Sequence, residues 1–315
     1  MHDLIVLGAG PAGLSASIYA SRYKINHIVI GNIFDGSVSK AHLIENWPGE
    51  KSVKGSDLIM KFYDHVKSLN TVIIQENVIG IEKERWSKPS ISKRLKEGFI
   101  ITTDANKVYK AKSILIALGT KHRKLNIPGE KKLLGKGVSY CAVCDGAFFK
   151  NKIVAVAGGS NSAAMAVTML SEHAKKVYMI YRRGELRCEP IMAERLKKNP
   201  KVEIIYNTNV IKVSGSKKVE SIEIDAKHKG KNEIKLDGLF IAIGLVPSAS
   251  MAESLGVEVD GDGYILVDQG GMTNINGVAA AGDITNNSNK LHQIVTAVSE
   301  GAIAVTSIYK YLKQR

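Results

Sequence analysis

Cys141 and Cys144 stand in the stretch CAVCDG with the spacing CxxC, which can serve a zinc site, a crosslink or a redox dithiol. A zinc site needs further ligands, and the chain offers only Cys188 and histidines that are not at zinc-ribbon spacing. A disulfide across two intervening residues closes too small a loop to stabilise a fold much. The pair therefore favours thiol-disulfide exchange, in which one cysteine attacks a substrate disulfide and the other resolves the mixed disulfide.

A glycine-rich turn near the start of the chain predicts a nucleotide site. The apolar run Leu4–Leu7 leads into LGAGPAG and then into helical spacing, which is the setting that the GxGxxG fingerprint requires. Gly8 permits the tight turn, Gly10 lets the backbone approach a pyrophosphate, and Gly13 allows helix to pack on strand. The next strand ends in Gly31 instead of the usual acidic residue, so the partner of an adenosine ribose is not evident.

A second unit of the same kind follows at residues 152–183, with strand, turn and helix in KIVAVAGGSNSAAMAVTML. Its loop departs from the fingerprint, because Ser160 replaces the second glycine between Gly158 and Ala163. A side chain there is expected to push a pyrophosphate outward. Two such units in one chain predict two bound nucleotides.

Three arginines end the second unit where a carboxylate would bind the ribose of NAD. Arg182, Arg183 and Arg187 suit a 2′-phosphate, since guanidinium forks bind phosphate and a carboxylate repels it. The competing interpretation is the solvated basic end of a strand.

The organisation of the chain repeats itself. At 315 residues two domains are expected, and each glycine unit is followed by short alternating strands and then by a buried strand, ILIALGT or GLFIAIG. A charged insert, Glu82 to Lys96, predicts an exposed hairpin or loop.

The tail from Val246 onward is expected to complete the first domain, with a final helix from about His292 to Leu312. Asp283, after a strand and a glycine, can accept hydrogen bonds from the hydroxyls of a ribityl chain.

Composition narrows the functional classes. The formal net charge of +14 and the pI near 9.5 suit an anionic substrate or an acidic partner, but the basic residues are scattered without interleaved aromatics, so no nucleic acid is expected. Three cysteines fit a reducing, cytoplasmic setting. The uncharged runs Leu4–Ser21 and Ile153–Ser171 are interpreted as strand, glycine turn and helix, and no membrane association is expected.

Six motifs occur together in an order that resembles the low-molecular-weight (bacterial-type) thioredoxin reductases of the FAD- and NAD(P)-dependent pyridine nucleotide-disulfide oxidoreductase family. They are LGAGPAG, ENWPGE at 45–50, ALGT at 117–120, CAVCDG, YRRGELR at 181–187 and AAGD at 280–283. The resemblance covers essentially the whole chain. It implies an α/β fold of two Rossmann-like three-layer (β/β/α) nucleotide-binding domains, the second inserted in the first. The FAD-binding domain would span residues 1–118 and 246–315, and the NADPH-binding domain, with the CxxC, residues 119–245.

The resemblance also implies an activity and the residues that perform it. Electrons would pass from NADPH through FAD and the Cys141-Cys144 disulfide to thioredoxin or a thioredoxin-like protein, in a homodimer whose domains rotate about hinges near 119–121 and 244–247. Cys144 would face the flavin, Cys141 would attack the substrate, and Asp145 would donate a proton, although a helix cap is the simpler role for this aspartate. The implied FAD contacts are Gly8, Gly10, Pro11, Ala12, Gly13, Asn46, Gly119, Gly282, Asp283, Gln293 and Ile294. The implied NADPH contacts are Gly158, Gly159, Ser160, Asn161, Ser162, Ala163, Arg182, Arg183 and Arg187.

Several positions depart from the family pattern. Asp35-Gly36-Ser37 replaces the usual GGQ, His292-Gln293-Ile294 replaces RQA, and Ala164 to Ala166 lack an acidic pair. Ser160 and the missing acidic pair favour an alternative, a flavin thioredoxin reductase that receives electrons from ferredoxin, whereas Arg182, Arg183 and Arg187 oppose it. A reductase of a one-electron carrier fits less well, because those relatives lack the CxxC. A nucleotide-binding module without turnover is the alternative from outside the enzymes.

Overall fold

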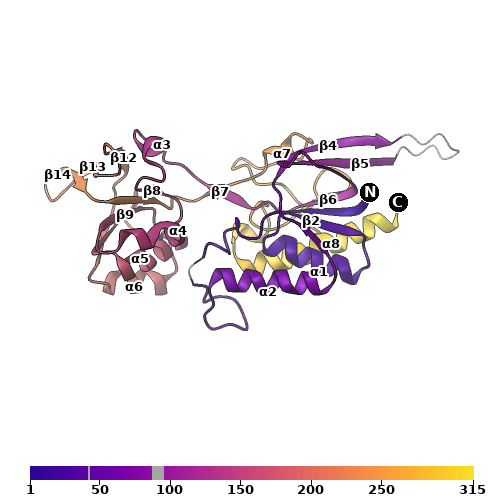
Figure 1. Cartoon of the computed structure of the whole chain (residues 1–315), viewed down its shortest axis with the longest axis horizontal. Helices are drawn as coiled ribbons and strands as arrows, with labels where there is room; N and C mark the ends of the chain where they lie inside the picture. Colours follow the sequence, from indigo (N-terminus) through magenta and orange to yellow (C-terminus); the bar gives the residue numbers. More distant parts are fainter. Residues whose placement is uncertain (42, 87–95) are drawn as a thin grey trace. The chain divides into compact units, whose positions relative to one another are not determined.

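The computed structural model describes residues 1–41, 43–86 and 96–315, which fold into two compact units. Unit 1 joins Met1–Lys121 to Val246–Arg315, and unit 2 is the intervening segment His122–Leu245. Both are α/β, and unit 2 is inserted in unit 1 (Figure 1). The predicted fold class is thereby confirmed.

Unit 1 contains a seven-stranded sheet with helices packed on it. Its elements in chain order are β1 (His2–Leu7), α1 (Pro11–Arg22), β2 (His27–Ile30), α2 (Gly55–Ser68), β3 (Val72–Ile74), β4 (Val78–Trp86), β5 (Lys96–Thr103), β6 (Val108–Ile116), α7 (Ser250–Glu253), β17 (Val278–Ala280), the 3₁₀-helix η2 (Ser288–Lys290) and α8 (Ile294–Lys313).

The sheet of unit 1 has the order β3-β2-β1-β6-β5-β4, with β17 also paired to β6. Strands β3, β2, β1, β6 and β17 are parallel, whereas β5 and β4 are antiparallel. The charged insert is a hairpin in its described part: residues 82–86 extend β4, and Lys96 begins β5 opposite Trp86. Residues 87–95 of the insert lie outside the described residues.

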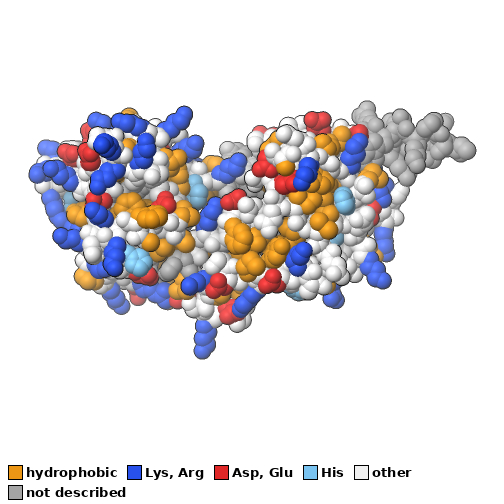
Figure 2. Space-filling model, viewed as in Figure 1, with side chains coloured by type: hydrophobic (Ala, Val, Ile, Leu, Met, Phe, Trp, Pro, Cys, Tyr) orange, Lys and Arg blue, Asp and Glu red, His pale blue; other side chains and the backbone are white. Residues whose placement is uncertain are grey.

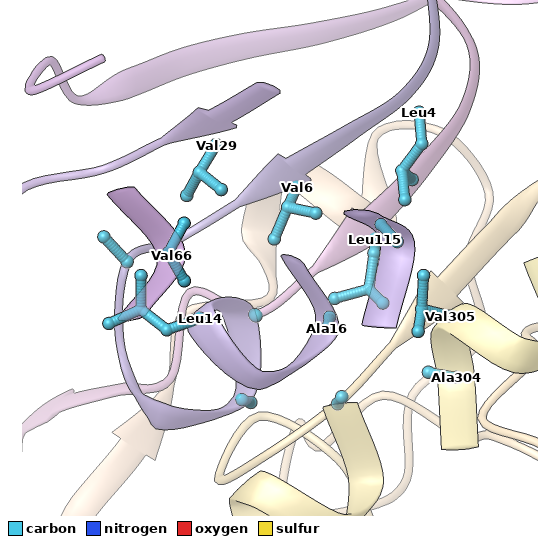
Figure 3. Packing of buried hydrophobic residues seen from close by; sticks show 14 of the residues in the cluster. Leu4, Val6, Leu14, Ala16, Val29, Val66, Leu115, Ala304 and Val305 are labelled. Atoms are coloured by element: carbon cyan, nitrogen blue, oxygen red, sulfur yellow. The ribbon is translucent and has the colours of Figure 1, made fainter. Parts of the chain in front are cut away.

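Residues Leu4–Leu7 of β1 are all apolar because both faces of this part of the strand are covered. Leu4 and Val6 point to the face on which α1, α2 and α8 lie (Figures 1 and 3), and Ile5 and Leu7 contribute to a second buried cluster on the other face. All four side chains have no exposed area, and each such burial stabilises the fold by about 1.5–3 kcal/mol. The carboxyl end of β1 and the turn after it are therefore held rigidly.

Unit 2 repeats the plan on a smaller scale. Its elements are α3 (Glu130–Leu133), β8 (Val138–Ser139), α4 (Ala142–Asp145), the 3₁₀-helix η1 (Gly146–Phe149), β9 (Ile153–Ala157), α5 (Asn161–His173), β10 (Lys176–Ile180), α6 (Pro190–Lys198), β11 (Val202–Ile205), β12 (Val210–Ser214), β13 (Ser221–His228), β14 (Lys231–Lys235) and β15 (Gly238–Ile241).

Three layers form unit 2. A parallel sheet of order β11-β10-β9-β15-β8 lies in the middle. Val154 and Val156 of β9 pack with α5 and α6 on one face, while Ala155 and Ala157 pack with the antiparallel sheet β12-β13-β14 on the other. The second glycine turn follows the carboxyl end of β9, which is the edge of the sheet where nucleotides bind in folds of this type.

Two short strands join the units. β7 (Thr120–His122) pairs with β16 (Leu245–Pro247), and each is preceded by a glycine of positive φ, Gly119 at 60° and Gly244 at 111°. L-residues with a side chain rarely adopt these angles. The glycines therefore set the path of both connections.

Both uncharged runs that could have been taken for membrane spans are a strand, a glycine turn and a helix, as predicted: β1 with α1, and β9 with α5. Among residues 1–41, 43–86 and 96–315, no helix is long and apolar enough to cross a membrane.

Candidate functional site

The turn after β1 has the geometry of a dinucleotide-binding loop. Gly8 has φ of 112°, and a Cβ on it would lie 2.2 Å from the carbonyl oxygen of Ala117. A Cβ on Gly13 would lie 1.9 Å from the carbonyl oxygen of Gly8. At Gly10, in contrast, an added Cβ would meet nothing within 4 Å. Two of the glycines are thus required by packing, and the third leaves open the space in front of α1 where a pyrophosphate would meet the helix N-terminus.

Gly31, where an acidic residue is usual, is explained by packing. An added Cβ there would lie 2.6 Å from the backbone nitrogen of Ala9, so the end of β2 lies directly against the glycine turn. The next residue, Asn32, accepts a hydrogen bond from the backbone N–H of Phe34 through Oδ1 (2.9 Å). The side chain of Asn32 therefore forms a hydrogen bond within its own loop.

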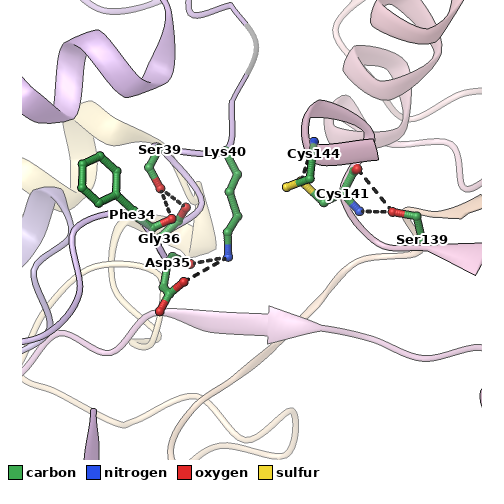
Figure 4. Close-up of a disulfide and its surroundings, with 8 residues drawn as sticks. All are labelled: Phe34, Asp35, Gly36, Ser39, Lys40, Ser139, Cys141 and Cys144. Atoms are coloured by element: carbon green, nitrogen blue, oxygen red, sulfur yellow. Dashed lines mark hydrogen bonds and ion pairs between the residues drawn. A yellow bond between two sulfur atoms is a disulfide. The ribbon is translucent and has the colours of Figure 1, made fainter. Parts of the chain in front are cut away.

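The segment Asp35-Gly36-Ser37 lies in a loop held by its own hydrogen bonds (Figure 4). Lys40 donates from Nζ to the carbonyl oxygen of Asp35 (2.8 Å). Ser39 Oγ lies 2.8 Å from the carbonyl oxygens of both Phe34 and Gly36. These contacts hold the loop through its backbone carbonyl groups, and the change from GGQ has no structural explanation.

Asp283 lies beside the first turn because Gly282 packs on α1: a Cβ on Gly282 would lie 3.0 Å from Cβ of Ala12. The backbone N–H of Gly282 donates to Oε2 of Glu300 (2.8 Å). Glu300 is 7% exposed and also accepts hydrogen bonds from the hydroxyls of Thr285 (3.1 Å) and Ser288 (2.6 Å). A buried carboxylate of α8 therefore fixes the loop that carries Asp283.

The carboxyl group of Asp283 fits a ribityl chain. Burial raises its pKa, the charge of Glu300 raises it further, and His292 opposes the shift. Within the described part of the chain, no protein group donates a hydrogen bond to this carboxylate. The side chain is half-buried, and hydroxyl groups of a bound flavin would supply hydrogen-bond donors to its carboxylate.

The start of α8 joins the same group of residues. Gln293 is the N-cap residue, and its backbone N–H donates to Oγ1 of Thr296 (3.2 Å). Oε1 of Gln293 accepts a hydrogen bond from Nδ2 of Asn46 (2.9 Å). The helix begins at Ile294, two residues later than the approximate start predicted. Two residues that the resemblance places at the flavin, 247 positions apart in the sequence, are thus in contact.

The second glycine turn has the same backbone as the first. Gly158 has φ of 142°, and its Cβ would lie 2.1 Å from the carbonyl oxygen of Ala242. Ser160 (φ −98°, ψ −177°) matches Gly10 (φ −82°, ψ −175°), so the backbone does not require glycine at this position. Its hydroxyl lies 3.3 Å from that of Ser162. Ser160 therefore leaves the turn intact and adds its hydroxyl group, beside that of Ser162, at the start of α5.

The segment 182–189, here called the arginine loop, is fastened to this turn. The backbone N–H of Arg187 donates to the carbonyl oxygen of Gly159 (2.7 Å). Asn161 and Glu189 exchange two hydrogen bonds: Nδ2 of Asn161 donates to Oε1 of Glu189 (3.1 Å), and the backbone N–H of Glu189 donates to Oδ1 of Asn161 (2.8 Å). The sequence had given no sign of the role of Glu189.

The three arginines of this loop are exposed. Among the described residues, none of the guanidinium groups of Arg182, Arg183 and Arg187 forms an ion pair with a carboxylate, so their charge is available to an anion.

Cys188, next to them, is a buried free thiol, and burial raises its pKa. A buried thiol with a raised pKa is a poor nucleophile.

Cys141 and Cys144 form a disulfide at the start of α4, with their Cα atoms 5.3 Å apart (Figure 4). Cys141 is the N-cap residue and its Sγ accepts a hydrogen bond from the backbone N–H of Cys144 (3.1 Å). Cys144 is exposed and Asp145 half-buried. Asp145 precedes η1, but its carboxylate makes no capping hydrogen bond, which argues against the simple role of a helix cap. A disulfide with one exposed cysteine and a donor directed at the sulfur of the other suits thiol exchange.

Comparison with known proteins gives consistent matches along the whole chain. The family model "Pyridine nucleotide-disulphide oxidoreductase" matches residues 2–301. A thioredoxin reductase of Listeria innocua is 39% identical, over 100% of this chain and 95% of its own length. The crystal structure of Lactococcus lactis thioredoxin reductase (FR conformation) shares 33% identity over 100% of both chains, with a TM-score of 0.90. The crystal structure of T. acidophilum thioredoxin reductase shares 35% identity over 98% of both chains, with a TM-score of 0.86.

A relative that is named for a different electron donor, ferredoxin, is also similar to this chain. A ferredoxin-flavin thioredoxin reductase of Clostridium acetobutylicum is 30% identical over 99% of this chain and 98% of its own, with a TM-score of 0.51. The family model and the full-length relatives agree with the resemblance carried by the six motifs. The chain belongs to the pyridine nucleotide-disulphide oxidoreductase family, in its branch of bacterial-type thioredoxin reductases.

Proposed function

We propose that the chain is an NADPH-dependent thioredoxin-disulfide reductase. It transfers two electrons from NADPH, through FAD and the Cys141-Cys144 disulfide, to the disulfide of thioredoxin or a thioredoxin-like protein. The observation that carries the proposal is a partly exposed disulfide in the same unit as a glycine turn that is bonded to the arginine loop, whose three arginines are exposed and form no ion pair within the described residues. FAD, when bound, supplies the two-electron relay between the nicotinamide and the disulfide.

Residues 1–118 and 246–315 are proposed as the FAD-binding domain. The open space at Gly10, the carboxylate of Asp283 without a donor, and the contact between Asn46 and Gln293 support this assignment. The start of α8 would direct its partial positive charge at the flavin and favour the reduced, more negative form. The proposed FAD contacts are those implied by the resemblance: Gly8, Gly10, Pro11, Ala12, Gly13, Asn46, Gly119, Gly282, Asp283, Gln293 and Ile294.

Residues 119–245 are proposed as the NADPH-binding domain. Backbone N–H groups at the start of α5 would hold the pyrophosphate, and the arginine loop would hold the 2′-phosphate. The proposed contacts are Gly158, Gly159, Ser160, Asn161, Ser162, Ala163, Arg182, Arg183 and Arg187.

The chemistry at the dithiol follows from the positions of its two cysteines. In the reduced pair, the thiolate of Cys141 would attack the substrate disulfide and form a mixed disulfide, and Cys144 would then displace the substrate thiol and restore the Cys141-Cys144 bond. Asp145 would supply the proton that the leaving thiolate takes up. Each cycle oxidises one NADPH, takes up one proton from solvent and reduces one substrate disulfide to two thiols.

Domain rotation is part of the proposal. The nicotinamide and the dithiol belong to the same domain and both need access to the flavin, so they would use it in turn. Gly119 and Gly244, in positive φ before β7 and β16, are suited to hinges. Replacing Gly244 by Ala is expected to lower turnover while leaving the flavin content unchanged; an unaffected turnover would count against a hinge there.

A homodimer and a cytoplasmic location complete the proposal. The resemblance supports the first, and the small number of cysteines supports the second. Sedimentation at several protein concentrations would test the dimer.

The second candidate is electron entry from ferredoxin. Ser160 and the uncharged Ala164–Ala166 favour it, as does the similarity to the ferredoxin-flavin enzyme; the exposed Arg182, Arg183 and Arg187 oppose it. The deciding experiment is an anaerobic absorbance titration of the yellow protein with NADPH, NADH and reduced ferredoxin in parallel. Stoichiometric bleaching by NADPH supports the proposal, and bleaching by ferredoxin alone overturns the NADPH assignment. A colourless protein that binds no FAD would favour the module without turnover.

A further inference from the structure

Tyr140, directly before Cys141, is tied to a buried acid. Its hydroxyl donates a hydrogen bond to Oε1 of Glu130. Glu130 is 4% exposed and also accepts hydrogen bonds from the backbone N–H groups of Leu125 (3.1 Å) and Ile127 (3.2 Å). The carboxylate thus joins the segment before the disulfide to the loop before α3, and the function proposed above uses neither residue.

Glu130 is itself fixed to the core of unit 2. The preceding Gly129 lies so close to β12 that an added Cβ would be 1.9 Å from the carbonyl oxygen of Val213. The backbone N–H of Val213 donates in turn to the carbonyl oxygen of Pro128 (2.9 Å), and Leu133 of α3 is 1% exposed. The Tyr140 hydroxyl is therefore bound to a rigid point.

The ring of Tyr140 has a second contact. It stacks on the ring of His122 in β7, with centroids 5.9 Å apart and an interplanar angle of 26°. Burial and the neighbouring Glu130 both raise the pKa of Tyr140. The phenol hence stays protonated, and able to donate, throughout the physiological pH range.

The backbone on either side of Tyr140 carries these constraints to the disulfide. Ser139 Oγ accepts a hydrogen bond from the backbone N–H of Cys141 (3.0 Å) and donates to its carbonyl oxygen (3.3 Å) (Figure 4). The same carbonyl accepts from the backbone N–H of Asp145 (3.1 Å). Through this arrangement Sγ of Cys141 lies 3.1 Å from the backbone nitrogen of Cys144.

We infer that Tyr140, held by Glu130 and His122, is a positioning residue. It keeps Sγ of Cys141 at the backbone N–H of Cys144 and so stabilises the thiolate form of Cys141. The inference rests on the proposed function, which gives Cys141 the role of the attacking thiol. A hydrogen bond to a thiolate stabilises the charged form. If the segment 139–141 loosens, this bond weakens and the thiolate becomes less available.

The test measures the reactivity of Cys141 directly. The full-length yellow protein is prepared in a Cys144→Ser background, in which the backbone N–H at 144 is retained and Cys141 cannot form the internal disulfide. The rate of alkylation by iodoacetamide is followed from pH 5 to pH 10 by peptide mass, which separates Cys141 from Cys188. Tyr140→Phe removes only the hydroxyl, and Tyr206→Phe makes the same change elsewhere in unit 2.

Tyr140→Phe is expected to raise the pH midpoint of Cys141 alkylation by about half a unit, so that the rate at pH 7 falls about threefold. Tyr206→Phe should leave the midpoint unchanged even if it lowers the melting temperature, which separates positioning from stability. His122→Ala, at an exposed residue, should shift the midpoint in the same direction and keeps the inference testable if Tyr140→Phe does not fold.

An unshifted midpoint in whichever of Tyr140→Phe and His122→Ala fold would overturn the inference, as would an equal shift in Tyr206→Phe. The measurement uses neither NADPH nor a disulfide protein. A chain that oxidises no NADPH would contradict the proposed function without affecting this result.

Discussion

The backbone N–H of Arg187 donates to the carbonyl oxygen of Gly159 at 2.7 Å, which fastens the arginine loop to the second glycine turn. Asn161 and Glu189 make the same connection through their side chains. The groups expected to bind the pyrophosphate and the 2′-phosphate therefore keep a fixed spacing before any nucleotide arrives. Such preorganisation reduces the entropy lost on binding.

Replacing Arg183 by Ala should raise KM for NADPH about 10- to 100-fold, the loss expected of a charge-assisted hydrogen bond worth about 1.5–3 kcal/mol. KM for NADH should hardly change, because NADH lacks the 2′-phosphate. Steady-state kinetics with both nucleotides measure the effect. Arg195→Ala, in the same unit but outside the arginine loop, is the control, and equal losses for both nucleotides would contradict the assignment.

Gly10 and Ser160 allow a matched test of the two turns. Gly10→Ala places a methyl group where the structure has free space, so the protein should fold yet lose most of its FAD, because the methyl group lies where the pyrophosphate would approach. Ser160→Gly should lower KM for NADPH for the converse reason. Flavin content per chain and nucleotide kinetics are the measurements; a fully yellow Gly10→Ala variant would show that this turn does not bind the pyrophosphate.

Asp283→Asn is expected to lower FAD affinity at least tenfold, through the loss of charged acceptors for the ribityl hydroxyls. Fluorescence of released FAD on dilution measures this change. Asn at the same position keeps the shape of the side chain, so an unchanged affinity would contradict the role of the carboxylate.

The same variant makes a prediction about pH after FAD is removed. Burial raises the folded-state pKa of Asp283 above its ordinary value, which is about 3.9 in an unfolded chain. The folded protein therefore holds this proton more tightly than the unfolded chain, and its stability falls as pH rises from about 4 through the folded-state pKa. FAD-free Asp283→Asn lacks this penalty. It should melt at a higher temperature than the FAD-free wild type at pH 7, with the difference vanishing below pH 4; no difference at either pH would contradict the burial effect.

The positive charge of the chain is concentrated in unit 2, which has 23 Lys and Arg against 12 Asp and Glu, a formal +11 of the total +14. Blue side chains are frequent along its upper and outer edges in Figure 2. Such a surface accelerates the approach of an acidic partner in a salt-dependent way. At saturating NADPH, kcat/KM for an acidic thioredoxin should fall about tenfold between 10 mM and 500 mM salt, and that for a small uncharged disulfide much less. Equal salt dependence for both substrates would contradict electrostatic steering.

Local sequence patterns predicted the two glycine turns and the strands before them, because spacing of glycine and apolar residues acts within one element. Contacts between distant segments were not predictable in this way. Glu300 in α8 and Glu130 in α3 are ordinary acidic residues in the sequence, and their roles depend on Gly282 and Tyr140 reaching them in the fold. Gly31 similarly departs from the expected acidic residue because it packs against Ala9.

The most direct test of the central claim compares wild-type protein with Cys141→Ser in the reduction of oxidised thioredoxin by NADPH, while the flavin absorbance is recorded. The wild type should turn over, and the variant should stay yellow, bleach with NADPH and reduce no thioredoxin. Sustained thioredoxin reduction by Cys141→Ser would contradict the claim that electrons leave through this cysteine.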